Sequence, residues 1–367
     1  MKLSVNRKEF SDVMNLAMTA INPRHVNPVV QNVMLEASGK KLTVYTTDLD
    51  VSLQSAVSEA VVKSDGKVLV PAVRLANVLK DMTSDSVDIS SEGEDVVLVS
   101  GKSRITMQTG DSKDFPDIPE FNSKNAIKVN AGELDNALSR AVKSIARDPG
   151  RYALNGVLMT PGENYIEVCG SDGRSLTYIK LEAKAKKQNF VIILPKHGVD
   201  TLIKLCERDP EAELKLDPRE NAIVAEQGGV TVSTMLVAGQ YPDYWSVIPR
   251  KNDKKMVVNR QEFLGAIRLA AHLTSIESQS IALDITSSGI SLRTKSSGTG
   301  SADVKASVTY KGDSVKMGFD PKYLIEGIAA MQADDVTCEF KDGNTGAIFH
   351  EGEKETSFYL VMPMEVD

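Results

Sequence analysis

The 367-residue sequence has no long apolar run, and its few cysteines follow no pattern. No stretch reaches the roughly 18 apolar residues of a membrane span, and Glu9 and Asp12 interrupt the first apolar stretch, so we expect neither a membrane segment nor a signal peptide. The cysteines at positions 169, 206 and 338 have no CxxC spacing. This favours buried, reduced thiols over disulfides or a zinc site, and we expect a cytoplasmic protein.

Motifs of common catalytic sites are also missing. The sequence has no G-x-S-x-G, no P-loop, no HExxH and no Rossmann fingerprint, and its four histidines are too scattered to predict a metal site. We therefore expect no enzymatic activity, no cofactor and no metal. The net charge of −7 argues against a generally basic surface, although a local basic stripe remains compatible with it.

The composition is that of a globular protein, because 41% of the residues are hydrophobic and 25% are charged. No Gly/Ser-rich or Pro-rich tract is long enough for a disordered linker, so the whole chain is expected to fold. A chain of this length divides into two or three domains, because a single core rarely exceeds about 200 residues.

Three segments of the chain repeat one pattern. Leu3–Phe10, Ile127–Leu134 and Met256–Phe263 each place an asparagine three residues before a glutamate, and their central valines lie 124 and 129 residues apart. The pattern resembles a capping box, in which the asparagine accepts a backbone amide and the glutamate reaches back. Apolar residues then recur at helical spacing. Each copy is therefore predicted to open with a strand that leads into an amphipathic helix.

A second strand-to-helix signal follows in every copy. Val68–Pro71, Ile192–Pro195 and Met317–Pro321 are apolar runs that end in a proline, which the first turn of a helix tolerates. Alternating runs such as Leu42–Thr46 and Tyr165–Cys169 read as strands. The prediction is an α+β fold of three tandem modules, each made of two β-α-β-β-β half-units. We place the domains at 1–124, 125–251 and 252–367.

Two acidic segments raise an enzymatic alternative. Asp48 and Asp50 could hold a divalent metal, and the segment Gly170–Gly173 could carry a nucleophile. Asp48 and Asp172 are, however, separated by the same 124 residues as the repeated scaffold. We therefore interpret both aspartates as caps of a repeated turn.

Four motifs, in order along the threefold repeat, resemble the bacterial DNA polymerase III beta subunit, the replicative sliding clamp. They are Tyr152–Gly156, Ser171–Arg174, Tyr241–Tyr244 and the ending Val361–Met364. The resemblance implies a head-to-tail homodimer that closes into a ring around duplex DNA. It also implies that helices line the pore and that antiparallel sheets form the outer wall.

The pore of such a ring needs positive charge that contacts phosphates without reading sequence. Lysines recur at equivalent places after the repeated prolines, and the resemblance adds residues from two loops. The predicted DNA-binding residues are Arg24, Lys80, Arg147, Arg151, Tyr152, Lys196, Lys204 and Lys322.

The resemblance also implies an apolar groove that receives short linear motifs from the replicative polymerase and the clamp loader. Methionines suit such a surface because their flexible side chains repack around different partners. The matching positions are Leu154, Ser171, Gly173, Arg174, Leu176, Pro242, Val247, Tyr323, Val361, Met362, Pro363 and Met364. A terminal core strand is the alternative interpretation of Val361, Met362 and Met364.

Three departures from the family pattern lie near this groove. Ser175 and Ser246 stand where many members have arginine, and Glu365 replaces a basic or small residue, so the rim is expected to be less positive. Trp245 is also unusual. For the dimer contact, the resemblance implies Ile105 and Met107 in the first domain and His272 and Leu273 in the third.

The clamp itself needs no cofactor, since a separate loader would use ATP. The alternative to a ring is a scaffold or regulatory protein that binds DNA through a basic face without encircling it. The two are distinguished by DNA topology, because a ring slides off free ends.

Overall fold

The computed structural model describes residues 1–148, 150, 152–185, 191–274, 280–296 and 300–365. The first predicted module consists of β1 (Lys2–Asn6), α1 (Arg7–Ala17), β2 (Asn32–Ser38), β3 (Lys41–Thr47), β4 (Val51–Val57), β5 (Val61–Ser64), β6 (Gly66–Pro71), α2 (Ala72–Asp81), β7 (Ser86–Glu92), β8 (Asp95–Ser100) and β9 (Ser103–Gln108).

The second and third modules repeat this order. The second consists of β10 (Ile127–Asn130), α3 (Ala131–Ala141), β11 (Gly156–Pro161), β12 (Tyr165–Ser171), β13 (Ser175–Lys184), β14 (Ile192–Pro195), α4 (Lys196–Cys206), β15 (Glu213–Pro218), β16 (Ala222–Gln227) and β17 (Val230–Met235). The third consists of β18 (Lys254–Asn259), α5 (Arg260–Ala271), β19 (Ile281–Thr286), β20 (Gly289–Ser296), β21 (Gly300–Ala306), β22 (Thr309–Tyr310), β23 (Val315–Phe319), α6 (Pro321–Ala329), β24 (Asp335–Phe340), β25 (Ala347–His350) and β26 (Ser357–Val361).

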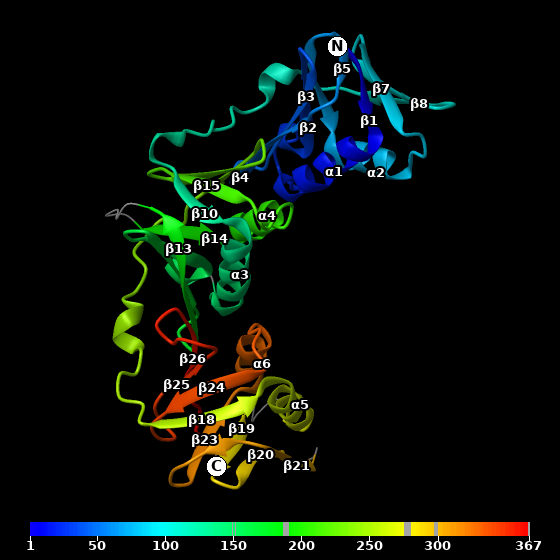
Figure 1. Ribbon diagram of the computed structural model, residues 1–367. Helices are drawn as coiled ribbons and strands as arrows, with labels where there is room; N and C mark the ends of the chain where they lie inside the picture. Colours follow the sequence, from blue (N-terminus) through cyan, green and yellow to red (C-terminus); the bar gives the residue numbers. More distant parts are fainter. Residues whose placement is uncertain (149, 151, 186–190, 275–279, 297–299, 366–367) are drawn as a thin grey trace. The chain divides into compact units, whose positions relative to one another are not determined.

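Six β-α-β-β-β half-units therefore follow one another in the described chain, as predicted, with β5 and β22 as short additions. Helices pack in pairs, α1 with α2 and α5 with α6 (Figure 1). Several strands alternate buried and partly exposed residues, as β4 does from Val51 to Val57, so that one of their faces is covered. Other strands, such as β11 and β26, are buried along most of their length.

The helix starts confirm half of the predicted capping box. The side chains of Asn6, Asn130 and Asn259 each accept the backbone amide three residues later, at 2.9–3.1 Å. The prediction that the glutamate reaches back is wrong for two copies. Glu9 Oε1 instead accepts the amide of Ser58 and Glu262 Oε1 that of Ser307, both at 2.7 Å. Each of these two glutamates thus links the start of its own helix to a loop about 45–49 residues further along the chain.

The three predicted prolines occupy different positions relative to the starts of their helices. Only Pro321 is inside the first turn of its helix, whereas Pro71 and Pro195 are the residues just before the first turn. The predicted apolar helix faces are confirmed, since residues such as Phe10, Leu134 and Phe263 are fully buried. The three cysteines are also free and buried, as predicted.

Contacts divide the chain into two compact units rather than three, and the cut passes through the middle module. The reason is that strand ladders join neighbouring modules. In the first unit β17 pairs with β4, with Thr234 opposite Val51, and in the second β26 pairs with β13, with Val361 opposite Ser175. The first unit holds Met1–Asp135, Ala183–Ala185 and Leu194–Leu236, and the second holds Asn136–Glu182, Lys186–Ile193 and Val237–Asp367.

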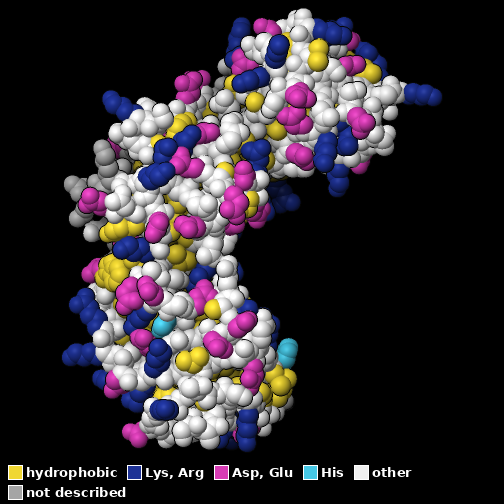
Figure 2. All heavy atoms as spheres, in the orientation of Figure 1, with side chains coloured by type: hydrophobic (Ala, Val, Ile, Leu, Met, Phe, Trp, Pro, Cys, Tyr) yellow, Lys and Arg dark blue, Asp and Glu magenta, His cyan; other side chains and the backbone are white. Residues whose placement is uncertain are grey.

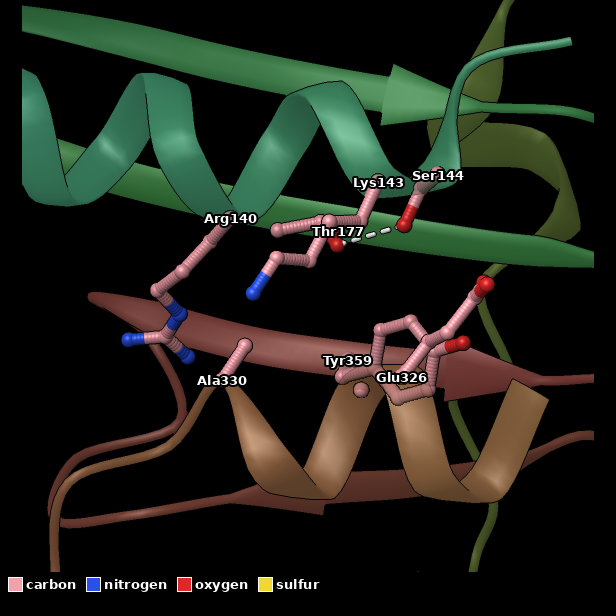
Figure 3. Close-up of a pocket in the computed structure, with 8 residues that line it drawn as sticks. Arg140, Lys143, Ser144, Thr177, Glu326, Ala330 and Tyr359 are labelled. Atoms are coloured by element: carbon pink, nitrogen blue, oxygen red, sulfur yellow. Dashed lines mark hydrogen bonds between the residues drawn. The ribbon is translucent and has the colours of Figure 1, made fainter. Parts of the chain in front are cut away.

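A buried ion pair joins the second and third modules within the second unit. Arg140, only 7% exposed, places Nη1 3.0 Å from Oε1 of Glu351, and Oε2 of Glu351 accepts the amides of Gln332 and Ala333. Figure 3 shows Arg140 and Lys143 projecting from α3 and the segment after it toward α6, with Ser144 bonded to Thr177 nearby. Burial lowers the pKa of Arg140, while Glu351 opposes this effect.

A second polar contact joins the first and second modules within the first unit. His197, in the first turn of α4, places Nδ1 3.2 Å from Oδ2 of Asp48 and Nε2 2.7 Å from the carbonyl oxygen of Thr19. The hydrogen bond with Asp48 raises the pKa of His197 to about 9, against the opposing effect of burial. Because both ring nitrogens face acceptors, the imidazolium form is favoured.

We expect this contact to weaken as the pH rises. A histidine whose pKa is raised on folding stabilises the protein fully below about 6.5, and this contribution is lost as the pH passes through about 9. Because the His197 side chain is 42% exposed, screening reduces the contribution to about 1–2 kcal/mol. Urea denaturation at pH 6 and pH 10 should show a larger loss for the wild type than for His197→Gln. Equal losses would contradict the assignment.

Candidate functional site

A groove of about 620 Å³ lies within the second unit. Its walls come from the turn between β12 and β13, from the end of β26, and from the connector that follows the second module. The lining residues are Leu154, Ser171, Gly173, Arg174, Ser175, Leu176, Tyr241, Pro242, Asp243, Tyr244, Val247, Leu360 and Met362. Most of this surface is aliphatic or aromatic, so the groove suits apolar side chains.

The β13–β26 ladder determines which residues at the end of β26 line the groove. Val361 lies opposite Ser175 and is fully buried in the core of the third module, while the next residue, Met362, is 41% exposed and lines the groove. The amide of Met362 donates to the carbonyl oxygen of Arg174 at 2.9 Å. Leu360 and Met362 therefore line the groove, while Val361 between them packs in the core.

The structure brings eight of the twelve predicted groove positions together. Leu154, Ser171, Gly173, Arg174, Leu176, Pro242, Val247 and Met362 line the groove. The other four, Tyr323, Val361, Pro363 and Met364, do not. The carbonyl oxygen of Tyr323 accepts the hydroxyl of Tyr359, and the amide of Met364 donates to the carbonyl oxygen of Gly318. Val361 is fully buried in the core of the third module, as the alternative of a core strand predicts.

The turn between β12 and β13 repeats one between β3 and β4. Oδ1 of Asp172 accepts the amides two and three residues further on at 2.8–2.9 Å, and Oδ1 of Asp48 does the same at 2.8–3.1 Å. Both turns need a left-handed residue, which is Gly173 in one and Leu49 in the other. The interpretation of both aspartates as turn caps is confirmed. Among the described residues no group of His, Cys, Asp and Glu could hold a metal ion.

An aromatic cluster holds the connector against the sheet. The rings of Tyr178 and Tyr244 lie 6.2 Å apart, and Glu167 accepts both hydroxyls, at 2.9 and 3.4 Å. Phe358 stacks on Tyr178 at 5.1 Å, and Trp245 meets the edge of Tyr178 at 5.0 Å. This cluster fixes the wall of the groove to which Tyr244 belongs.

Sequence reasoning missed five lining residues. Tyr241, Asp243 and Tyr244 belong to the motif Tyr241–Tyr244. The family resemblance assigns only Pro242 of this motif to the groove. On the β13–β26 ladder, Ser175 pairs with Val361, and Leu360 pairs with Leu176. Only that strand pairing places them, and a single sequence does not reveal it.

Replacing Tyr241 with phenylalanine is expected to leave stability unchanged or to raise it by up to about 1 kcal/mol. The Tyr241 hydroxyl is buried beside the backbone of Ser171 and the thiol of Cys169 but makes no hydrogen bond of good geometry among the described residues, and a poorly paired buried polar group is costly. The equivalent residue of the first connector, Phe115, is also buried but has no hydroxyl. Thermal denaturation measures the effect, and a loss of more than about 1 kcal/mol would mean that the hydroxyl is bonded.

The predicted DNA-binding lysines are exposed on helix ends. Lys80 and Lys204 lie in the last turns of α2 and α4, and Lys196 and Lys322 in the first turns of α4 and α6. Two of them are already ion-paired, Lys196 with Asp200 at 2.5 Å and Lys204 with Glu207 at 2.6 Å.

The predicted loop residues are only partly described. Arg24 and Arg147 are exposed. Tyr152 begins the 3-10 helix Tyr152–Asn155, and Arg151 lies outside the described residues. Basic and acidic side chains are interspersed over the face seen in Figure 2. On this face the basic side chains do not gather in one patch, and the DNA-binding assignment rests on positions along the helices.

The predicted dimer residues lie on a sheet edge and a helix end. Ile105 and Met107 belong to β9, the edge strand of the sheet β5-β1-β7-β8-β9. His272 is the exposed C-cap of α5, and Leu273 follows it. In the third module β21 is likewise an edge strand, next to β20.

Comparisons with known proteins agree over the full chain. Family models of the DNA polymerase III beta subunit match residues 1–119 (N-terminal domain), 128–243 (central domain) and 245–365 (C-terminal domain). The beta sliding clamp of Pseudomonas putida is 27% identical over 368 residues, covering 100% of both chains.

Solved structures of DNA polymerase III beta subunits also match over the full chain. The crystal structure of the DNA polymerase III subunit beta from Pseudomonas aeruginosa matches with a TM-score of 0.94 and 27% identity, covering 100% of both chains. A second structure of that protein, bound to griselimycin, matches equally well, with a TM-score of 0.94, 27% identity and 100% of both chains covered. No described helix is long and apolar enough to cross a membrane. Sliding clamps are accessory subunits of a DNA polymerase and not enzymes, which confirms the prediction that the chain is non-enzymatic. The chain belongs to the DNA polymerase III beta subunit family, the beta sliding clamps.

Proposed function

We propose that two copies of this chain form a head-to-tail ring that encircles duplex DNA and tethers the replicative polymerase. The observation that carries the proposal is the run of six like half-units, because modules of similar shape joined through unlike ends favour a closed ring. We place the domains of each subunit at 1–124, 125–251 and 252–367. The helices would line the pore and the sheets would face outward.

The two edge strands support the head-to-tail contact. Strand β9 lies at the edge of a sheet in the first module and β21 at the edge of a sheet in the third. Pairing β9 of one subunit with β21 of the other would satisfy both edges, which otherwise expose unpaired backbone groups. Ile105, Met107, His272 and Leu273 would lie at or near this contact.

The charge of the helices supports a DNA-facing role. The six described α-helices carry ten lysines and arginines and eight aspartates and glutamates, whereas the whole chain has 43 and 50. A helix-lined pore would thus be more positive than the rest of the protein. We assign DNA contacts to Arg24, Lys80, Arg147, Arg151, Tyr152, Lys196, Lys204 and Lys322.

The apolar groove is the proposed docking site for short motifs of the polymerase and the clamp loader. Its lining residues, together with Tyr323, Pro363 and Met364, form the proposed partner surface, and the fully buried Val361 contributes through the strand that carries Leu360 and Met362. A relative with the same fold binds griselimycin, so this compound is a suitable first probe of the groove.

The decisive experiment compares DNA topologies. Clamp loaded onto a nicked circular plasmid should remain bound through gel filtration and should be lost when the plasmid is linearised. Equal retention on both forms would favour a DNA-binding scaffold that does not encircle its target. The free protein should have a solution mass of about 80 kDa, twice the 39.8 kDa of the chain.

Reversing the charge of Lys80 should weaken DNA binding. Lys80 has no ion-pair partner among the described residues, whereas Lys204 is neutralised by Glu207. We expect Lys80→Glu to reduce retention on circular DNA several-fold and Lys204→Glu to have a smaller effect, with both differences vanishing at high salt. Identical behaviour of the two variants would remove the ion pair from the explanation.

A further inference from the structure

Trp245, the only tryptophan of the chain, is 41% exposed and belongs to the connector that supplies one wall of the groove. It belongs to the 3-10 helix Tyr244–Val247, between two groove-lining residues. Its ring contacts Tyr178 at 5.0 Å and Tyr244 at 5.3 Å. The underlying cluster therefore holds the indole in place, so its exposed part is an ordered surface and not a mobile side chain.

A carboxylate is held by the backbone amide of Trp245. Asp243 is exposed, lines the groove, and caps the same 3-10 helix, since its Oδ1 accepts the amide of Trp245 at 3.2 Å. Its Oδ2 has no partner among the residues that the structure describes. Glu167, the other acid of this region, is occupied by two tyrosine hydroxyls. Asp243 is thus the acid on this wall that has capacity for a ligand.

The groove lining includes a cation, Arg174, which belongs to a different wall from Asp243. Arg174 comes from the β12–β13 turn, whereas Asp243 and Trp245 come from the connector. The neighbouring connector residue, Ser246, is neutral and donates its hydroxyl to the carbonyl oxygen of Asp243. Between Tyr241 and Val247 the connector therefore carries an exposed aromatic side chain and a negative charge but no lysine or arginine.

We propose that Asp243 and Trp245 form a subsite for an arginine of the docked peptide, just outside the apolar anchors. The guanidinium would stack on the indole and bond to the free carboxylate oxygen. Arginine fits better than lysine, because its planar group stacks on aromatic rings and donates in a fixed fork. The proposal rests on the groove being the docking site, and it adds the chemistry that flanks the motif.

Paired synthetic peptides test this subsite. The probes are a set of hexapeptides with leucine at two positions and either arginine or citrulline at a flanking position. Citrulline keeps the shape and the stacking surface of arginine but carries no charge. Binding to the full-length protein is followed by the emission of Trp245 and by calorimetry. We expect the best arginine peptide to bind at least about five-fold more tightly than its citrulline partner, with a shift of Trp245 emission.

Two matched variants complete the test. Asp243→Asn keeps the helix cap, because asparagine caps as well as aspartate, and should abolish the preference for arginine. Asp117→Asn changes the equivalent residue of the first connector and should leave the preference intact. Equal binding of arginine and citrulline peptides, or a preference that survives in Asp243→Asn, would overturn the subsite while leaving the groove in place. If neither the peptides nor griselimycin binds the wild type, the groove proposal falls and the subsite with it.

Discussion

Replacing Glu351 with alanine is expected to lower the free energy of unfolding by about 3–5 kcal/mol, because it leaves the buried charge of Arg140 unpaired. Arg140 is 7% exposed, so water does not replace the lost carboxylate. The change also removes the acceptor of the Gln332 and Ala333 amides. Urea denaturation followed by circular dichroism measures the loss.

Two controls separate the charge effect from a general loss of glutamate. Glu355 is exposed, and Glu355→Ala should change stability by less than about 0.5 kcal/mol. The double variant Arg140→Met with Glu351→Gln removes both charges and should recover much of the loss, as replacing a whole buried pair often does. A loss below about 1 kcal/mol for Glu351→Ala would show that Arg140 finds another partner or solvent.

Replacing Met362 with aspartate is expected to reduce the affinity for griselimycin at least about 30-fold, which corresponds to about 2 kcal/mol. The side chain lines the groove and is 41% exposed, so the substitution places a charge on the proposed docking surface without opening the core. The same variant should lose polymerase stimulation in a primer-extension assay. Calorimetry and primer extension measure the two effects.

Met235 provides a matched control for this substitution. It is 43% exposed at the end of β17 and does not line the groove. Met235→Asp should leave both griselimycin binding and polymerase stimulation unchanged. If Met362→Asp binds griselimycin normally, the compound and the partner motif do not use this groove.

The repeated architecture was predictable because short sequence patterns specify its helices and strands. Asn6 and its two counterparts mark the helix starts, and the alternation of apolar residues marks the strands. The paired lysines show what a closer reading could have added. Lys196 and Asp200 are four residues apart, and Lys204 and Glu207 three, which are the spacings of helical ion pairs.

The site was less predictable because strands from different modules build it. The lining role of Leu360 depends on its place on the β13–β26 ladder, where it pairs with Leu176, 184 positions earlier (360 − 176). The same kind of ladder explains why the described chain forms two compact units instead of three. Glu9 and Glu262 also bind loops that no local pattern connects to them.

The buried thiols have a practical consequence for studying ring closure. Burial raises the pKa of Cys206 to about 12 and raises the pKa of Cys169 as well, so little reactive thiolate forms at neutral pH. Maleimides and bifunctional crosslinkers should therefore spare the native cysteines. A single cysteine engineered into each of β9 and β21 could then be bridged selectively, which would turn the proposed subunit contact into a covalent link that can be closed before or after DNA is added.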